Sequence, residues 1–209
     1  MCGPQLPELV RYARLLVEVG LPLGLLGPRE VPRLWDRHLL NCAAVAPALR
    51  AGSQVVDVGS GAGLPGLVWA LLRNDLDIVL LEPLLRRADF LGLVVAELGL
   101  PHVRVERARA EAARDRYAAD VVAARAVAPL PRLVTWTMPL LRPGGRLLAF
   151  KGESAAAELA AAAAELSTAG TTSAVVTTYG EGILDPPTRV VEVTAGPGQD
   201  QARSAQTPA

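Results

Sequence analysis

Apolar residues follow two different periods along the chain, and the period changes near residue 53. In residues 5–19 and 28–50, apolar side chains recur three and four positions apart, which predicts amphipathic helices. Farther along, short apolar runs rich in β-branched residues alternate with helix-like segments. We expect strands at 54–58, 77–82, 102–106, 119–124 and 145–150. The segments with a helical pattern are 64–73, 84–98, 109–115, 130–141 and 153–168.

This alternation predicts an α/β fold, a doubly wound and mostly parallel sheet with helices on both faces. Residues 78–81 are apolar throughout, as a central parallel strand requires. Residues 141–146 are expected to form the turn before the fifth strand. Two further runs, 172–178 and 188–194, flank a turn at 185–187 and are expected to pair antiparallel. The prediction is therefore a seven-stranded sheet with one reversed strand.

Three parts of the chain differ in pattern and define its expected organisation. Residues 1–52 are expected to be an N-terminal helical extension packed on the core, and residues 53–195 the domain that contains the sheet. Residues 196–209, rich in Gly, Pro, Gln, Ser and Thr, are expected to be a disordered tail. A length of 209 residues suits one medium domain with a short extension.

The composition narrows the compartment and the class of partner. Hydrophobic residues make up 51% of the chain, yet it contains no run of about 18 uncharged apolar residues. Charges within residues 5–19 interrupt any signal-peptide core. Cys2 and Cys42 lack metal-ligand spacing, so we expect no bound metal and a reducing, cytoplasmic compartment. We also expect a monomer without a membrane partner. Because the net charge is zero, a nucleic-acid partner would require a local basic face.

A glycine-rich loop follows the first predicted strand. Residues 59–66 read Gly-Ser-Gly-Ala-Gly-Leu-Pro-Gly and lead into a helical segment. Residues without Cβ let backbone amides approach a ligand and tolerate positive φ. The N-terminus of the following helix adds unpaired N–H groups and the positive end of its dipole. The loop contains Gly-x-Gly-x-x-Gly, so a dinucleotide and S-adenosylmethionine both remain candidate ligands.

Two acidic residues bear on this choice. Asp57 lies two residues before Gly59, where its carboxylate would repel a pyrophosphate but suit the ammonium of S-adenosylmethionine. Glu82 closes the second strand, 25 residues after Asp57, and can accept hydrogen bonds from both ribose hydroxyls. Because a ribose is present in both ligand classes, Asp57 is the residue that favours S-adenosylmethionine.

Several motifs within residues 28–152 carry a family resemblance. They are Leu-Trp-Asp-Arg-His-Leu-Leu-Asn at 34–41, the loop at 56–66, Leu-Glu-Pro-Leu-Leu-Arg-Arg-Ala-Asp-Phe-Leu at 81–91, Ala110-Glu111, Ala-Arg-Ala at 124–126 and Phe-Lys-Gly at 150–152. Together they resemble the RsmG (GidB) family of small-subunit ribosomal RNA guanine-N7 methyltransferases. The chain departs from the family at Asn41 and Glu82, where aspartate is usual, and lacks the usual Trp-Asn and Asn-Leu-Thr in residues 12–28.

The resemblance implies a class I, Rossmann-like methyltransferase that uses S-adenosylmethionine to methylate N7 of a specific guanine in 16S rRNA, within the 30S subunit or a precursor. It also implies a cofactor site that contains Gly59, Leu64, Ala110, Glu111 and Arg125, to which the residues themselves add Asp57, Gly61 and Glu82. Guanine N7 carries a lone pair and no proton, so orientation and electrostatics suffice without a general base. No catalytic residue is assigned; the candidates at strand ends are Lys151 and Arg125.

Basic residues along the chain are candidates for RNA contact. They are Arg37, His38, Arg86, Arg87, Lys151 and Arg189, with Arg29 and Arg33 nearby on the N-terminal segment. Each arginine is equally a solvated surface charge, and the Arg37-His38 pair is equally a means of docking the N-terminal helix to the core.

Three other functions remain open at this stage. The chain is alternatively a methyltransferase for a small molecule or a protein, which its zero net charge allows. The glycine loop also fits a nicotinamide oxidoreductase. A ribosome-assembly factor that binds the cofactor without catalysis is the third.

Overall fold

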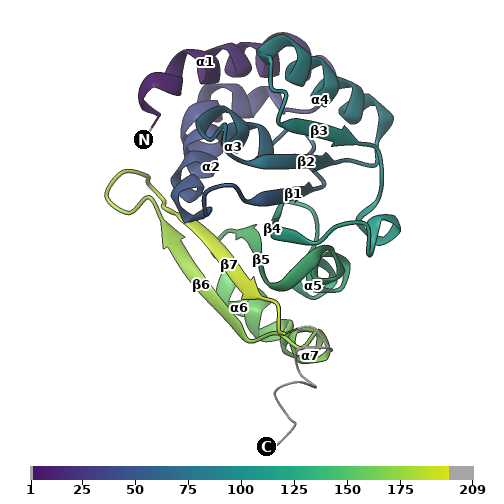
Figure 1. Ribbon diagram of the computed structural model, residues 1–209. Coiled ribbons are helices and arrows are strands. Elements are labelled where there is room, and N and C mark those ends of the chain that lie inside the picture. The colour runs from purple at the N-terminus through teal and green to yellow at the C-terminus, as the bar shows by residue number, and fades with distance from the viewer. Residues whose placement is uncertain (1, 198–209) are drawn as a thin grey trace, which may run out of the picture.

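The computed structural model describes residues 2–197. Seven strands form one sheet in the order β3-β2-β1-β4-β5-β7-β6 (Figure 1). Strands β1 to β5 pair in parallel, and β7 pairs antiparallel with β5 and β6. The strands are β1 (Gln54–Val58), β2 (Asp77–Leu81), β3 (Val103–Glu106), β4 (Ala119–Arg125), β5 (Leu141–Lys151), β6 (Ser173–Tyr179) and β7 (Thr188–Thr194). The predicted seven-stranded, mostly parallel sheet with one reversed strand is confirmed.

Helices cover both faces of the sheet, as the doubly wound pattern predicts (Figure 1). One face packs against α1 (Leu6–Leu15), α2 (Leu40–Val45), α3 (Gly66–Leu72) and α4 (Leu85–Leu98). The other packs against α5 (Leu130–Thr137), α6 (Ala155–Ala161) and α7 (Ala163–Thr168). Each face of the sheet therefore has its own hydrophobic core, the first under α1 to α4 and the second under α5 to α7. Side chains alternate along β1, so Val55 points into the first core and Val56 into the second.

The N-terminal region is less regular than its hydrophobic period predicts. The helix expected over 28–50 is divided into a 3-10 turn (Pro28–Arg33), a π-helical turn (Leu34–Leu39), α2 and a second 3-10 turn (Ala46–Ala48). Pro32 lies inside the first turn, where it removes a backbone N–H donor, so a continuous α-helix is excluded. The first helix is bounded by a 3-10 turn (Gly3–Gln5) and a π-helical turn (Leu16–Gly20).

Two shorter segments also differ from the expectation. Residues 109–115 contain a 3-10 turn (Ala110–Ala113) in place of a helix, and Asp115 just beyond it has φ 60°, outside the helical region. Residues 141–146, expected as a turn, belong to β5. The register between β4 and β5 shifts between Ala119 and Val121, and this irregularity accommodates Pro143 and its following glycines in the strand. A 3-10 turn (Met138–Leu140) precedes β5.

The N-terminal segment packs on the sheet domain, with α1 against α3 and α4 and α2 against α3. The division into an extension and a domain stays a prediction, and most of the predicted tail (198–209) lies outside the described residues. Within residues 2–197, no helix is both long and apolar enough to cross a membrane. The same residues contain no cluster of three or more His, Cys, Asp or Glu side chains suited to a metal ion.

Candidate cofactor site

The loop between β1 and α3 adopts the conformation that its glycines allow. Gly59, Gly61 and Gly63 have φ values of 66°, 58° and 97°, a region that residues with a side chain rarely adopt. A Cβ on Gly59 would lie 2.8 Å from Val127 Cγ2, and one on Gly63 would lie 2.2 Å from Leu67 Cδ1. Backbone conformation and close packing therefore both require glycine here.

Asp57 and Glu82, the predicted cofactor acids, hold this loop in place. Asp57 Oδ2 accepts a hydrogen bond from the Gly66 N–H at 3.0 Å, at the start of α3. Glu82 Oε2 accepts from the Gly61 N–H at 2.9 Å, and its Oε1 accepts from the Leu84 N–H at 3.0 Å. Both side chains are buried. The two carboxylates thus brace the loop backbone at the carboxyl ends of β1 and β2.

Asp57 retains an unused acceptor. Its Oδ1 is buried and has no hydrogen-bond partner within the part of the chain that the structure describes. Burial raises the pKa of Asp57 to about 7, against the lowering effects of the Gly66 N–H and of the Ser60 hydroxyl, which donates to the Asp57 backbone carbonyl at 2.8 Å. A buried carboxylate oxygen without a donor is costly, and a ligand cation beside it would remove that cost. The donor that this site lacks is the kind that a methionine ammonium supplies.

A cavity of about 220 Å³ opens beside the loop, at the carboxyl ends of β1 and β2. Its walls are mainly apolar, and they bring together three predicted cofactor residues, Gly59, Ala110 and Glu111. The remaining lining residues are Val58, Leu81, Pro83, Ala108, Arg109, Val127 and Trp136. The cavity adjoins β1 and β4, where the strand order reverses, which is where open α/β sheets bind ligands. An apolar slot with an aromatic wall suits a nucleobase.

Five cofactor candidates do not line these walls: Asp57, Gly61 and Glu82, which belong to the braced loop, and Leu64 and Arg125. Leu64 packs against the first core. Arg125, the last residue of β4, turns its guanidinium to the N-terminal segment. It donates to the Arg37 carbonyl oxygen at 2.9 Å and to His38 Nδ1 at 2.8 Å. The structure thus joins a predicted cofactor residue to two predicted RNA-binding residues, in the docking arrangement that the sequence also allowed.

Lys151, a candidate for both catalysis and RNA contact, forms an internal ion pair. Its Nζ lies 2.6 Å from Glu158 Oε2 and donates to the Ala128 carbonyl oxygen at 2.8 Å. The Lys151 side chain is 9% exposed, and the pair joins the end of β5 to α6. Lys151 also pairs in register with Arg189 on β7.

The other RNA candidates lie on different elements. Arg86 and Arg87 lie in the first turn of α4, just after Leu84, whose N–H donates to Glu82 Oε1. Arg29 and Arg33 lie on the 3-10 turn Pro28–Arg33, beside the π-helical turn that carries Arg37. One pair of arginines thus lies on the N-terminal segment, and the other lies at the start of α4.

Sequence reasoning missed residues that the fold brings to the loop. Tyr12 Oη on α1 donates to the Ala62 carbonyl oxygen at 2.7 Å, 50 positions away along the chain. Trp136 on α5 lines the cavity, and the Arg132 Cζ lies 5.7 Å from its ring centre. Trp136 is a large aromatic residue of α5 that is not among the buried positions of that helix, such as Leu133 and Thr137. An aromatic side chain outside the buried face of a helix is the sequence signal that could have identified it.

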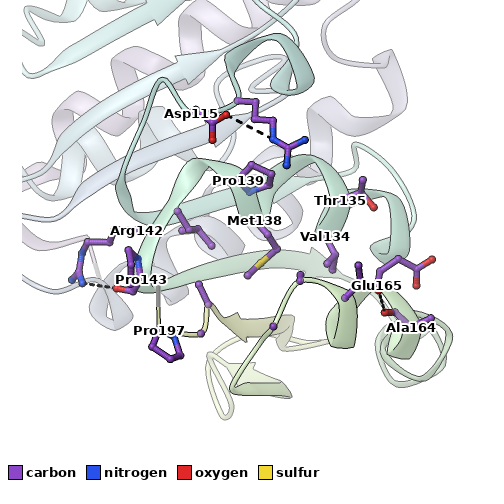
Figure 2. Close-up of a pocket in the computed structure, with 17 residues that line it drawn as sticks. Asp115, Val134, Thr135, Met138, Pro139, Arg142, Pro143, Ala164, Glu165 and Pro197 are labelled. Carbon is purple, nitrogen blue, oxygen red and sulfur yellow. Dashed lines mark hydrogen bonds and ion pairs between the residues drawn. The ribbon is translucent and has the colours of Figure 1, made fainter. Parts of the chain in front are cut away.

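A larger groove of about 710 Å³ lies near the amino ends of β4 and β5, against α5 and α7 (Figure 2). Its arginines pair with near neighbours: Arg142 Nε lies 2.6 Å from Asp120 Oδ1, and Arg114 Nε lies 3.9 Å from Asp115 Oδ2. The smaller cavity is lined instead by Gly59 of the glycine loop and by Ala110 and Glu111, three of the predicted cofactor residues. We therefore place the candidate site there.

Comparison with known proteins shows the family of this chain. The family model for rRNA small subunit methyltransferase G matches residues 5–185. A protein named ribosomal RNA small subunit methyltransferase G from Thermobifida fusca is 56% identical over 192 residues, which are 92% of this chain and 81% of that protein. A protein of the same name from Streptomyces coelicolor is 53% identical over 204 residues, 97% of this chain and 85% of that protein.

Solved structures share the fold at low sequence identity. A SAM-dependent O-methyltransferase from Thermotoga maritima matches with a TM-score of 0.61 at 13% identity, over 81% of this chain and 71% of that one. The S-adenosylmethionine-dependent methyltransferase SibL matches with a TM-score of 0.64 at 21% identity, over 90% of this chain and 62% of that one. By family model and by relatives over half identical, the chain belongs to the rRNA small subunit methyltransferase G (GidB) family.

Proposed function

We propose that this protein transfers the methyl group of S-adenosylmethionine to N7 of one guanine in 16S rRNA, within the 30S subunit or a precursor, and that it acts as a monomer. Membership of the methyltransferase family supports the reaction and the class of substrate. The observation that carries the proposal is the buried Asp57 Oδ1, which lacks a donor among the described residues and lies beneath a loop of left-handed glycines.

The residues present fit this cofactor. Asp57 would hold the ammonium, and the loop amides around Gly59 and Gly61 would lie along the amino acid and the ribose. The apolar cavity between Pro83, Ala110 and Trp136 would take the adenine. When bound, the cofactor supplies an electrophilic methyl group on a sulfonium. Glu82, already bonded to Gly61 and Leu84, fixes the shape of the loop and retains free lone pairs for a ribose hydroxyl.

The target atom explains why the site needs no strong base. Guanine N7 has an available lone pair and carries no proton, so the protein has to orient the base and shield the reacting atoms. Arg125 and Lys151 remain the candidates for contact with the base. For Lys151 to take part, its ammonium would have to leave Glu158.

Because the net charge of the chain is zero, an RNA substrate would require a local basic face, for which the arginines are the candidates. Arg29, Arg33 and Arg37 lie on the N-terminal segment, and Arg86 and Arg87 lie at the start of α4. Arg109 lines the cavity itself. Phosphate contacts from such residues make binding fall with salt concentration.

Transfer of labelled methyl groups tests the proposal. Undermethylated 30S subunits, naked 16S rRNA, a protein extract and a metabolite extract are each incubated with labelled S-adenosylmethionine and the protein. We expect label in 16S rRNA as 7-methylguanosine at one position, and much less label with Asp57→Asn at the same cofactor concentration. Label confined to protein or metabolites would support the alternative methyltransferase, and calorimetry that detects NAD binding but no S-adenosylhomocysteine binding would support an oxidoreductase.

A further inference from the structure

Arg125 attaches the N-terminal segment to the sheet beside the glycine loop. Its Nη2 donates to the Arg37 carbonyl oxygen at 2.9 Å and to His38 Nδ1 at 2.8 Å. Its Nη1 lies 3.3 Å from Sγ of the buried Cys42. The guanidinium is a planar group whose donors point in fixed directions, so these simultaneous partners select one orientation of Arg125.

The contact with His38 defines the state of its imidazole. A guanidinium only donates, so Nδ1 must carry the lone pair in the 2.8 Å contact with Arg125. The ring proton is therefore on Nε2, which donates to Glu30 Oε2 at 2.9 Å. Burial and the charge of Arg125 lower the pKa of His38, which favours this neutral form. Glu30, His38 and Arg125 thus form a chain in which each group orients the next.

The chain of contacts ends at the wall of the cofactor cavity. Arg125 is followed by Ala126, whose φ of 54° is in the left-handed region that non-glycine residues seldom adopt. Val127 comes next and lines the cavity, and its Cγ2 lies 2.8 Å from the position of a Cβ on Gly59. A strained turn persists only where its surroundings hold it, and Arg125 is the anchored residue on its N-terminal side.

We propose that Glu30 and His38 are positioning residues, which set the cofactor affinity of the cavity by orienting Arg125 and the turn 125–127. This inference rests on the proposed function, because it takes S-adenosylmethionine as the ligand of the cavity. The same N-terminal segment carries Arg29, Arg33 and Arg37.

A double-mutant cycle on cofactor binding tests this role. His38→Ala, Arg125→Gln and the combined variant are titrated with S-adenosylhomocysteine by calorimetry. We expect His38→Ala to weaken binding about tenfold alone and less than about twofold in the Arg125→Gln background. His38→Asn should bind within about threefold of wild type, because its amide oxygen can accept from Arg125 as Nδ1 does. Additive losses, or an equal loss with Ala and Asn at position 38, would overturn the proposal.

Two further measurements keep the test decisive. Urea denaturation of each variant separates loss of the fold from loss of positioning. Glu30→Ala, which removes the acceptor of the His38 Nε2–H, is the second variant should His38→Ala not fold, and we expect it to weaken binding about threefold with wild-type Arg125 and not measurably with Arg125→Gln. Because the cycle needs no RNA, a coupled cycle without methyl transfer to 30S subunits overturns only the proposed substrate. No binding of S-adenosylhomocysteine by the wild type overturns both.

Discussion

Two hollows in this molecule lie near opposite ends of the parallel strands, one at their carboxyl ends and one at their amino ends. The smaller one is the better candidate site. The cavity of about 220 Å³ at the carboxyl ends of β1 and β2 is lined by Gly59 of the glycine loop, whose backbone two buried acids brace. The groove of about 710 Å³ beside α5 and α7 (Figure 2) contains two arginines paired with neighbouring carboxylates and the half-buried Glu165. Polar groups aimed at an absent partner, rather than volume, distinguish a binding site.

The largest expected effect comes from adding a methyl group to one glycine of the loop and to one glycine of the groove. Gly63 in the loop and Gly170 in the groove both have left-handed φ values, 97° and 63°. A Cβ on Gly63 would overlap Leu67 Cδ1 at 2.2 Å, whereas within residues 2–197 nothing lies within 4 Å of a Cβ on Gly170. Gly63→Ala should therefore destabilise the protein by about 3 kcal/mol and abolish cofactor binding, and Gly170→Ala by about 1 kcal/mol.

Urea denaturation measures both glycine variants, and calorimetry with S-adenosylhomocysteine measures binding. Gly170→Ala is the matched control, since it carries the backbone strain without the overlap. Equal losses of stability in the two variants would show that the loop is no more tightly packed than the groove.

Asp57→Asn should separate binding from stability. Folding raises the pKa of Asp57 from 3.8 to about 7, so between these values the folded state holds a proton that the unfolded state has released. The contribution of Asp57 to stability is therefore complete below pH 3.8 and is lost as the pH rises to about 7. Asparagine does not ionise, so Asp57→Asn should raise the free energy of unfolding at pH 8 by at most about 4 kcal/mol. We expect a higher unfolding midpoint than wild type at pH 8 and a similar one at pH 4.

The same substitution should weaken cofactor binding at least about tenfold, because it removes a charge-assisted contact with the ammonium. For the wild type at pH 6, ionisation of Asp57 on binding should release close to one proton, and Asp57→Asn should release none from this group. Calorimetry in buffers of different ionisation enthalpy counts these protons. Equal proton release by both proteins would mean that the ammonium does not lie against Asp57.

Local features of the chain were predictable from sequence, whereas contacts across it were not. The left-handed Gly59 and the buried run of β2 follow from residue type and period, which act within a few residues. The contact of Arg125 with the Arg37 carbonyl joins residues 88 positions apart, so no local pattern encodes it. For Lys151, its position at a strand end was predictable but its pairing with Glu158 was not.

A smaller effect is expected from the aromatic wall of the cavity. Trp136 lines the cavity, whereas Met138, two residues later, lines the groove. Trp136→Leu should weaken S-adenosylhomocysteine binding about fivefold by removing a stacking surface, and Met138→Leu should leave it unchanged. In a protein that retains Trp136 but has Trp35→Phe and Trp69→Phe, the remaining fluorescence should change on binding. An unchanged signal with intact affinity would place the adenine elsewhere.

The smallest expected effect comes from the groove itself. Glu165 on α7 lines it, and in the described part of the molecule its buried Oε2 has no hydrogen-bond partner. Unlike Asp57, however, Glu165 is only half-buried and has no glycine loop beside it, so water can solvate the rest of its carboxylate. Glu165→Gln should therefore change the unfolding free energy by less than about 1 kcal/mol and leave methyl transfer at the wild-type rate. A tenfold fall in kcat or in cofactor affinity would show that the groove takes part in function, and volume would then be the better guide to this molecule.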